Sequence, residues 1–575
     1  MERVRTTLAA AGIGVSLLAP AAIASTASAG PAETTQQAGG HEFVVAVDTA
    51  APEAGLASIT DAGGTVVDVN ESLGLVLVSA GEGFISEVSG DAGVEGAAQN
   101  HAVGSVQPNQ GHIVATDRLT VVEGQRGTGA SGTTAAAGSG AGRAAPDPLT
   151  NLQWDMAAIG ATADGAHRRA TGDGVTVGII DTGIDASHPD IAPNFSAEMS
   201  RNFTMDIPSV DGPCEYATCI DPADVDHGGH GTHVAGTVAA ARNGIGITGV
   251  APDATLVNLR AGQDSGYFFV YETVAALTEA GNLGLDVVNM SFFTDPWLYN
   301  CASLADYISG PVTPEDIAEQ AFIRSTVLAA TEYAHDHGVT LVAAAGNSHF
   351  NLALPTRFDT ISPDYPGGTE VARTVTNNCL DLPSEAPDVI SVSSTGPSGT
   401  KADYSNYGLG DVEVSAPGGW FRDFVGTPAF ATPANLIMST YPLELAIDEG
   451  LANPDGTPTD NFSASDCSVS PCAFYTTLQG TSMASPHAAG VAALIVQAHG
   501  RGNLRRGFSL DPAQVRTILE TTATDHACPA GGVEIYTDEG RPAEFNAVCE
   551  GTTAENGLYG EGIVNAVAAV ARSRR

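Results

Sequence analysis

The side chains best suited to chemistry in this sequence are an aspartate, an asparagine and a histidine that stand within two positions of a glycine. Asp181 follows the apolar run Gly174–Ile180, and Asn347 follows a second apolar run, Val339–Ala345; both runs predict buried strands. His230 opens the motif His-Gly-Thr-His-Val-Ala-Gly, whose small residues predict a helix that lies close to the sheet. Because α/β sheets place their sites at the carboxyl ends of parallel strands, we expect these side chains to converge.

A serine completes the set. Ser482 lies in Gly-Thr-Ser-Met-Ala-Ser-Pro-His, just before a helix expected over 488–498, so Pro486 fits only if it falls in the first turn of that helix. A serine hydroxyl becomes a nucleophile when a histidine removes its proton, and an aspartate holds that histidine in the right tautomer. An asparagine N–H can stabilise the oxyanion that forms on an attacked carbonyl. The four side chains therefore predict hydrolysis through an acyl-enzyme.

In the order Asp, His, Asn, Ser, these motifs resemble those of the subtilisin-like serine proteases, the subtilases, over residues 151–570. Further motifs that carry the resemblance are Tyr404–Gly408, Ser415–Gly419 and Gly560–Ala566. The resemblance implies a catalytic triad of Asp181, His230 and Ser482, with Asn347 in the oxyanion hole. It also implies an α/β three-layer domain with a mostly parallel sheet flanked by helices, protein or peptide substrates, no catalytic cofactor and a monomer.

The resemblance also implies a structural calcium site. Asp190 and the loop 241–247 match the family's tight site, in which an aspartate, an asparagine and backbone carbonyls supply the oxygens that Ca²⁺ prefers. The expected ligands are the side chains of Asp190 and Asn243 and the carbonyls of Ala241, Ile245 and Ile247. A glycine-rich loop without metal is the alternative.

Two other functions stay open on the sequence. His227, His230 and His233 form an HxxHxxH run that could bind zinc on a helix, although Gly228 and Gly229 disfavour a helix that begins so early. His233 is expected to pack against the sheet. The second alternative is a binding protein on a subtilase scaffold, with its cleft blocked by the segment 292–299.

Three insertions, near 293–322, 350–388 and 419–475, interrupt the family pattern. Where the family usually has a small residue after Asn289-Met290-Ser291, this chain has Phe292-Phe293-Thr294. We expect the insertions to roof or narrow the cleft. The family's usual preference for a large apolar residue before the scissile bond is therefore in doubt for this chain.

The chain before residue 149 predicts a removable leader. Residues 1–29 have a basic start, an apolar stretch and Ala-Ser-Ala, the pattern of a secretory signal. Residues 41–107 predict an α+β, ferredoxin-like module in the order strand–helix–strand–strand–helix–strand, and this module resembles the family's inhibitory and chaperoning propeptide. Residues 108–148 contain a Gly/Ala/Ser-rich linker, in which maturation would fall, and 149–575 form the catalytic domain.

Charge and cysteine content fit an extracellular protein. The chain has 23 basic and 66 acidic side chains, a net charge of −43, which argues against nucleic acids and anionic membrane surfaces as partners. The 8 cysteines favour disulfides over zinc, because no CxxC pair occurs. Cys214/Cys219 and Cys467/Cys472 can close small loops, and the nearest-neighbour pairing of the rest is Cys528/Cys549 and Cys301/Cys379.

Overall fold

The computed structural model describes residues 41–101, 146–294, 296–365, 368–503 and 507–571, all within one unit that spans 40–575. The predicted signal 1–29 and nearly all of the predicted linker 108–148 lie outside the described residues. Among the helices that are described, none has the length and apolar character needed to cross a membrane.

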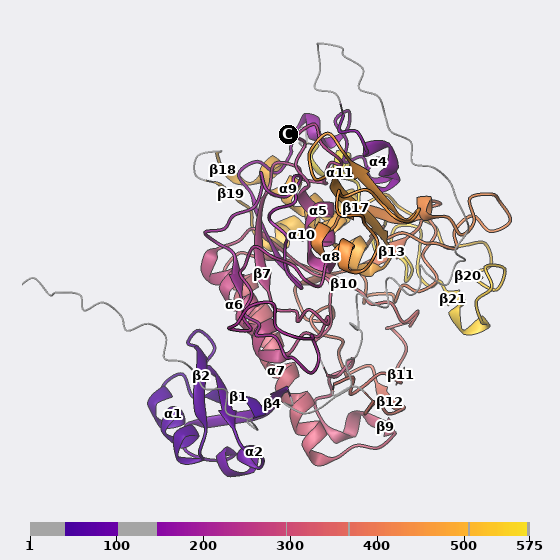
Figure 1. Ribbon diagram of the computed structural model, residues 1–575. Coiled ribbons are helices and arrows are strands. Elements are labelled where there is room, and N and C mark those ends of the chain that lie inside the picture. The colour runs from indigo at the N-terminus through magenta and orange to yellow at the C-terminus, as the bar shows by residue number, and fades with distance from the viewer. Residues whose placement is uncertain (1–40, 102–145, 295, 366–367, 504–506, 572–575) are drawn as a thin grey trace, which may run out of the picture. The chain divides into compact units, whose positions relative to one another are not determined.

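A seven-stranded parallel sheet forms the centre of the part that follows residue 148 (Figure 1). In spatial order its strands are β14 (Val414–Pro417), β13 (Val389–Thr395), β10 (Thr340–Ala344), β8 (Val287–Met290), β5 (Thr176–Ile180), β7 (Thr255–Arg260) and β6 (Arg201–Asn202). The two runs predicted as buried strands are β5 and β10, so the predicted α/β fold is confirmed.

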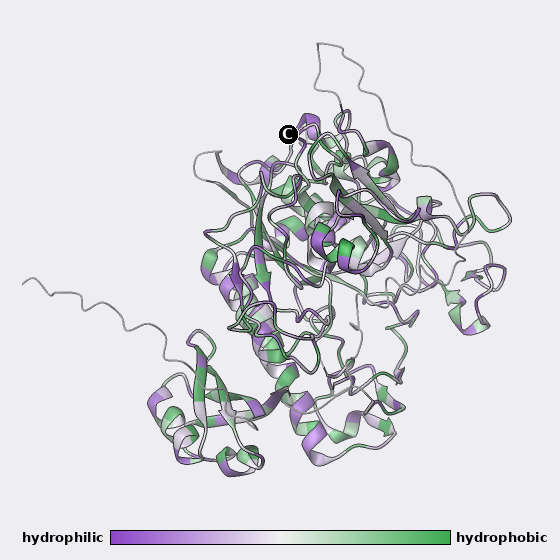
Figure 2. Ribbon diagram, in the orientation of Figure 1, coloured by the Kyte–Doolittle hydropathy of each residue, from purple (hydrophilic) through white to green (hydrophobic). Residues whose placement is uncertain are grey.

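Helices cover both faces of this sheet, and side-chain alternation along the strands explains why. Val177 and Ile179 of β5 pack with α5 (His230–Ala239) and α9 (Thr481–His499). Ile180 of the same strand packs in the opposite core, with α6 (Val270–Leu283) and α7 (Pro314–Asp336). Because both faces are buried, β5 and β10 are apolar after their first residue, whereas α6 and α7 carry hydrophobic and hydrophilic residues along their length (Figure 2). The sheet and the two helical layers on its faces thus form three layers.

Helix α9 begins earlier than the sequence pattern predicts. It starts at Thr481 rather than near residue 488, so Ser482 lies inside its first turn and Pro486 lies in the helix interior. Proline has no N–H to donate to the carbonyl four residues earlier, here that of Ser482. The hydroxyl of Ser291 donates to this carbonyl instead, at 3.0 Å. A donor outside the helix thus replaces the hydrogen bond that Pro486 cannot give to the Ser482 carbonyl. The sequence pattern could not reveal this donor.

The module at residues 41–101 has the predicted order of elements. It comprises β1 (His41–Val47), α1 (Pro52–Asp61), β2 (Thr65–Asn70), β3 (Leu75–Ala80), α2 (Phe84–Val88) and β4 (Val94–His101), with an antiparallel sheet in the order β2-β3-β1-β4. Phe43 and Val45 pack within the module, whereas Val44 belongs to the core that contains α6 and α7. The apolar run in β1 is continuous because both of its faces are buried.

The insertions build small sheets of their own. Segments 293–322 and 350–388 contribute β9 (Tyr307–Ser309), β11 (Thr356–Asp359) and β12 (Arg373–Thr376) to one three-stranded sheet. The disulfide Cys301–Cys379 joins these two segments. The third insertion contains α8 (Leu443–Asp448), β15 (Ile437–Thr440) and β16 (Ser463–Asp466), and β17 (Ala473–Leu478), which completes their three-stranded sheet, begins within it.

The remaining elements lie around these layers. They are α4 (Trp154–Ile159), α10 (Pro512–Thr522) and α11 (Ala566–Ala569), the pair β18 (Arg501–Asn503) and β19 (Gly507–Ser509), and the pair β20 (Val533–Glu534) and β21 (Ala547–Val548). All eight cysteines are disulfide-bonded, in the pairs Cys214–Cys219, Cys301–Cys379, Cys467–Cys472 and Cys528–Cys549. The nearest-neighbour pairing is confirmed, and zinc binding by these cysteines is excluded.

Candidate active site

Three neighbouring strands of the sheet end in polar residues at the same edge. Asp181 directly follows β5, Ser291 directly follows β8, and Asn347 lies three residues beyond the end of β10. These strands are adjacent in the order β10-β8-β5. The parallel sheet therefore brings together groups that are up to 166 positions apart in sequence, as the prediction from strand ends required.

Asp181 and His230 form a buried hydrogen-bonded pair. Nδ1 of His230 lies 2.8 Å from Oδ1 of Asp181, and the two side chains are 1% and 0% exposed. The carboxylate accepts, so Nδ1 carries the proton and Nε2 is the basic nitrogen of the neutral ring. The same carboxylate oxygen accepts from the backbone N–H of Thr182 at 2.8 Å, which fixes its direction. This pair can act as an oriented general base.

Asp226 is a positioning residue that the sequence analysis missed. Its buried carboxylate accepts from the backbone N–H groups of Gly228, Gly229 and Thr232 at 2.8–3.1 Å. It also accepts from the hydroxyls of Thr182 and Thr232. Asp226 thus ties the residue after Asp181 to the N-terminus of the helix that begins with His230. An aspartate shortly before a helix start is an available signal for such a role.

Ser291 contacts Ser482 twice. The Ser291 hydroxyl donates to the Ser482 carbonyl, and the Ser482 hydroxyl donates to the Ser291 carbonyl at 3.3 Å. Ser482 stands at the second position of α9, where backbone N–H groups have no partner within the helix. Its N–H is therefore suited to bind an anionic oxygen.

Asn347 is oriented by Thr481. Its side-chain oxygen accepts from both the backbone N–H and the hydroxyl of Thr481, at 2.9 Å each. The amide nitrogen consequently points away from Thr481. Asn347 and Ser482 line the same cavity, so an amide donor and the serine face one volume.

The HxxHxxH run does not form a three-histidine site. α5 begins at His230, after Gly229 with a φ of 77°, so His227 lies before the helix. Nε2 of His233 lies 3.1 Å from the carbonyl of Ile437, in agreement with a packing role. The three histidines thus have different surroundings, and the prediction of a zinc hydrolase built on them is wrong.

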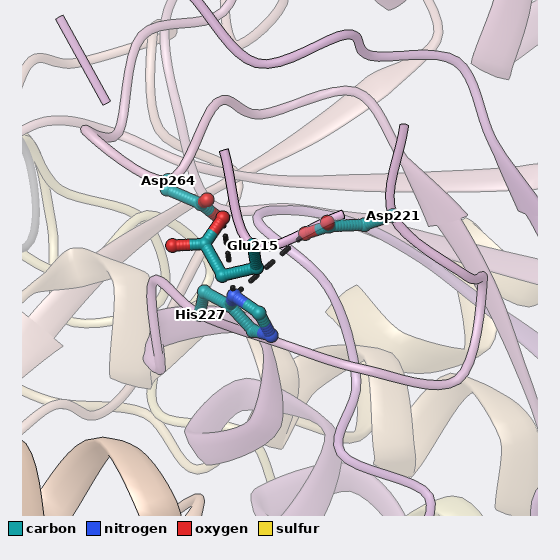
Figure 3. A group of neighbouring side chains, drawn as sticks. All are labelled: Glu215, Asp221, His227 and Asp264. Carbon is teal, nitrogen blue, oxygen red and sulfur yellow. Dashed lines mark ion pairs between the residues drawn. The ribbon is translucent and has the colours of Figure 1, made fainter. Parts of the chain in front are cut away.

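His227 instead joins an acidic cluster with Glu215, Asp221 and Asp264 (Figure 3). Its Nδ1 lies 3.6 Å from Glu215 and 4.0 Å from Asp221. The four side chains could hold a cation, but the buried guanidinium of Arg260 already pairs with Asp221 and with Asp264. Burial is the main cause that raises the pKa of Asp264 to about 8.

The loop predicted to bind calcium does lie against Asp190. Asp190 accepts from the Nδ2 of Asn243 at 3.2 Å, the N–H of Ile247 at 3.0 Å and the hydroxyl of Tyr475 at 2.8 Å. Burial raises the pKa of Asp190 to about 7. Asp147 and Asp466 accept from Gly244 and Gly246 of the same loop. Oxygen-rich side chains therefore surround the loop, although Asp190 itself faces three donors.

This fold and this set of side chains fit a serine hydrolase built on a parallel α/β sheet. A model of the subtilase family matches residues 172–559, which is more than half of the chain, and the chain belongs to this family. It is therefore a serine-type endopeptidase of the subtilase family. It is 28% identical over 421 residues to Subtilisin Savinase of Lederbergia lenta, covering 73% of this chain and 98% of the relative. M-protease of Shouchella clausii is also 28% identical, with 73% and 70% covered.

Solved structures agree on the fold. The epidermin leader peptide processing serine protease of Staphylococcus aureus aligns with a TM-score of 0.58 at 17% identity, over 92% of this chain and 98% of that one. Fervidolysin from Fervidobacterium pennivorans aligns with a TM-score of 0.52 at 22% identity, over 93% and 61%. At these identities the likeness concerns the fold and not the substrate.

Proposed function

We propose that this chain is a secreted endopeptidase that hydrolyses peptide bonds through an acyl-enzyme on Ser482 and is made as a self-processing precursor. The observation that carries the proposal is the buried Asp181–His230 hydrogen bond at the sheet edge where Ser291 holds Ser482. A pure binding protein has no need of these groups together with an oriented Asn347. We therefore set aside the binding-protein alternative.

In this mechanism the Ser482 hydroxyl turns from the Ser291 carbonyl toward His230. The basic Nε2 of His230 takes the proton while the serine oxygen attacks the substrate carbonyl. The carboxylate of Asp181 stabilises the imidazolium that forms. His230 then gives the proton to the leaving amine, and a water molecule hydrolyses the acyl-enzyme by the same route in reverse. No metal takes part.

The negative charge of the tetrahedral intermediate needs donors in fixed positions. The amide nitrogen of Asn347 and the backbone N–H of Ser482 are the proposed donors. Thr481 supports this role, because its two hydrogen bonds hold the side-chain oxygen of Asn347 toward Thr481 and leave the amide nitrogen pointing away from Thr481. Such preorganised donors act without a cost of reorientation during the reaction.

Residues 41–107 are proposed as an inhibitory propeptide, cut off after His101 within the linker. Its described part supports this proposal through contacts with α6: the side chain of Asn100 accepts from the N–H of Tyr271 at 3.0 Å and donates to the Glu272 carboxylate. Asn70 donates to the Thr278 hydroxyl at 2.9 Å. These bonds hold the module on the helical layer of the catalytic part.

A structural calcium ion at the loop 241–247 remains a proposal. The carboxylates of Asp147, Asp190 and Asp466, together with Asn243 and the loop carbonyls, provide the oxygen donors that Ca²⁺ prefers. The ion would have to replace the donors that now face Asp190. Its effect would be on stability.

The test compares the secreted chain with its Ser482→Ala variant. We expect the wild type to lose residues 1–107, to digest a denatured protein and to react with a serine-directed phosphonate. Ser482→Ala should stay full length and inert, while Ser485→Ala keeps the phosphonate reaction. Normal processing and digestion by Ser482→Ala would refute the proposal, and a wild type that is processed by another protease but inert would restore the binding-protein reading.

A further inference from the structure

A cavity of about 200 Å³ opens beside the proposed nucleophile, and Asp381 lines it. Its volume is below the roughly 300–1,000 Å³ of pockets for drug-sized ligands, so it suits one side chain rather than a whole small molecule. Ser482 and Asn347 line the same cavity. A side chain that enters it therefore belongs to the substrate residue whose carbonyl Ser482 attacks. We call this volume the Asp381 cavity.

The apolar part of the Asp381 cavity is formed by Phe292, Phe293, Leu298 and Ile361, of which the last three belong to the insertions. The ring of Phe292 is held by a parallel stack on Phe268, with ring centroids 4.0 Å apart. These walls suit an aliphatic or aromatic stem.

Asp381 is a buried carboxyl group whose side chain has no hydrogen-bond or ion-pair partner within the described part of the chain. It is 3% exposed, and neither of its side-chain oxygens accepts a hydrogen bond or joins an ion pair there. Its Oδ2 lies 3.5 Å from the point that a Cβ on Gly346 would occupy, so the carboxylate reaches the residue before Asn347. A buried carboxylate without a partner is costly, and a cation that enters the cavity would relieve that cost.

The nearby arginine does not supply that cation. The Arg357 guanidinium donates to both oxygens of Glu385 and also to the carbonyls of Cys379 and Leu352. Glu385 in turn accepts from the backbone N–H of Asp381 at 2.7 Å. Arg357 thus hydrogen-bonds to Glu385 and not to Asp381, although its positive charge still acts on Asp381 by lowering the pKa of that carboxyl. Burial, and next the charge of Glu385, raise the pKa of Asp381 above its ordinary value.

We propose that Asp381 determines specificity: the Asp381 cavity takes a lysine or arginine side chain of the substrate residue before the scissile bond. The aliphatic stem lies between Phe292 and the other apolar walls, and the cationic head reaches Asp381. Lysine and arginine are the side chains that combine an apolar stem with a positive tip. This inference rests on the proposed role of Ser482 as nucleophile.

The experiment uses the mature enzyme and peptides that differ only before the scissile bond: arginine, lysine, leucine and citrulline, the neutral analogue of arginine. We expect kcat/KM for arginine and lysine to exceed that for leucine and citrulline by about 100-fold or more, since only a cationic side chain can form an ion pair with Asp381. Asp381→Asn should lower kcat/KM for the basic peptides by about 100-fold and leave the leucine peptide within a few-fold. Asp448→Asn, which removes an exposed carboxylate at the end of α8, should change neither.

The outcomes separate this inference from the proposed function. An enzyme that reacts with a serine-directed phosphonate but prefers leucine, or treats arginine and citrulline alike, refutes the role of Asp381 and leaves the proposed function standing. An enzyme that neither reacts with the phosphonate nor cleaves any peptide refutes both. The comparison of arginine with citrulline needs only the wild type, so it decides the matter even if Asp381→Asn does not fold.

Discussion

The hydroxyl of Ser291 donates a 3.0 Å hydrogen bond to the carbonyl of Ser482, the one carbonyl in the first turns of α9 that Pro486 deprives of its helical donor. This hydrogen bond joins the end of β8 to the start of α9, and it replaces the helical hydrogen bond that Pro486 cannot donate. The hydroxyl of Ser485 also lies 2.9 Å from that of Ser291. This small network holds the backbone of the proposed nucleophile.

Ser291→Ala should therefore weaken both the fold and the activity. Leaving the Ser482 carbonyl buried without a donor is expected to lower the free energy of unfolding by about 1–3 kcal/mol. A small displacement of the nucleophile should lower kcat by about 10- to 100-fold. Denaturant unfolding and peptide kinetics measure the two effects. Ser485→Ala is the matched control, because it keeps the bond from Ser291, and an equal loss in both variants would contradict the explanation.

Asp226→Ala should misplace His230 without touching the substrate. The variant removes the acceptor for three N–H groups and two hydroxyls, so we expect a loss of about 2–4 kcal/mol in the free energy of unfolding. Labelling by a serine-directed phosphonate should slow in the folded fraction. Asp185→Ala is the control, since among the described residues the Asp185 carboxylate accepts hydrogen bonds from Ser187 alone. Unchanged labelling in Asp226→Ala would count against a positioning role.

Asn347→Leu should act on turnover rather than on binding. The asparagine N–H is needed when the carbonyl oxygen becomes negative, so kcat should fall by about 10²–10³ with KM nearly unchanged. Initial rates over a range of peptide concentrations separate the two constants. An unchanged kcat would remove Asn347 from the oxyanion hole.

The contact between Asn100 and Glu272 should weaken as the pH rises. Burial, and next the charge of Glu42, raise the pKa of Glu272 to about 8 while it is enclosed. A carboxyl group returned to water titrates near 4.5, so the enclosed form holds a proton that the open form releases between these values. The contact is thus strongest below about pH 4.5 and is lost progressively as the pH rises to 8. Hydrogen exchange of the β4 amides in the full Ser482→Ala chain measures this.

Glu272→Gln is the control for that pH dependence. The amide stays neutral and hydrogen-bonded to Asn100, so protection of β4 should no longer fall between pH 5 and pH 8. If the wild type and Glu272→Gln show the same pH dependence, another group is responsible.

Removal of calcium should lower thermal stability if the loop 241–247 binds the ion. A ligand that binds only the folded state raises the melting temperature with its concentration. We expect a chelator to lower the melting temperature of the wild type and Asp190→Asn to abolish the response. Asp448→Asn should respond as the wild type does. A melting temperature independent of calcium would leave the glycine-rich loop without metal as the correct interpretation.

The residues around the proposed chemistry were readable in the sequence because each is set by local pattern. A buried strand that ends in Asp181 or Asn347, and a helix of small residues that begins at His230, follow from the apolar runs and glycines beside them. The pairing of all eight cysteines also followed from their spacing. The predicted start of α9 is wrong, because a distant residue makes Pro486 tolerable inside the helix. The hydroxyl that replaces the missing N–H of Pro486 belongs to Ser291, 195 positions earlier.

The sequence alone thus predicted the class of fold from its apolar runs, and the four candidate catalytic side chains from short motifs that resemble those of the subtilases. Only the tertiary structure showed that Asp226 organises the start of α5 and that Asp381 lines the cavity of Ser482. The disulfide Cys301–Cys379 and the paired backbones of Asn300 and Leu380 bring two insertions together next to Asp381. A contact between distant loops produces no periodic pattern in the sequence, because it depends on where the ends of β8 and β10 lie in the folded sheet.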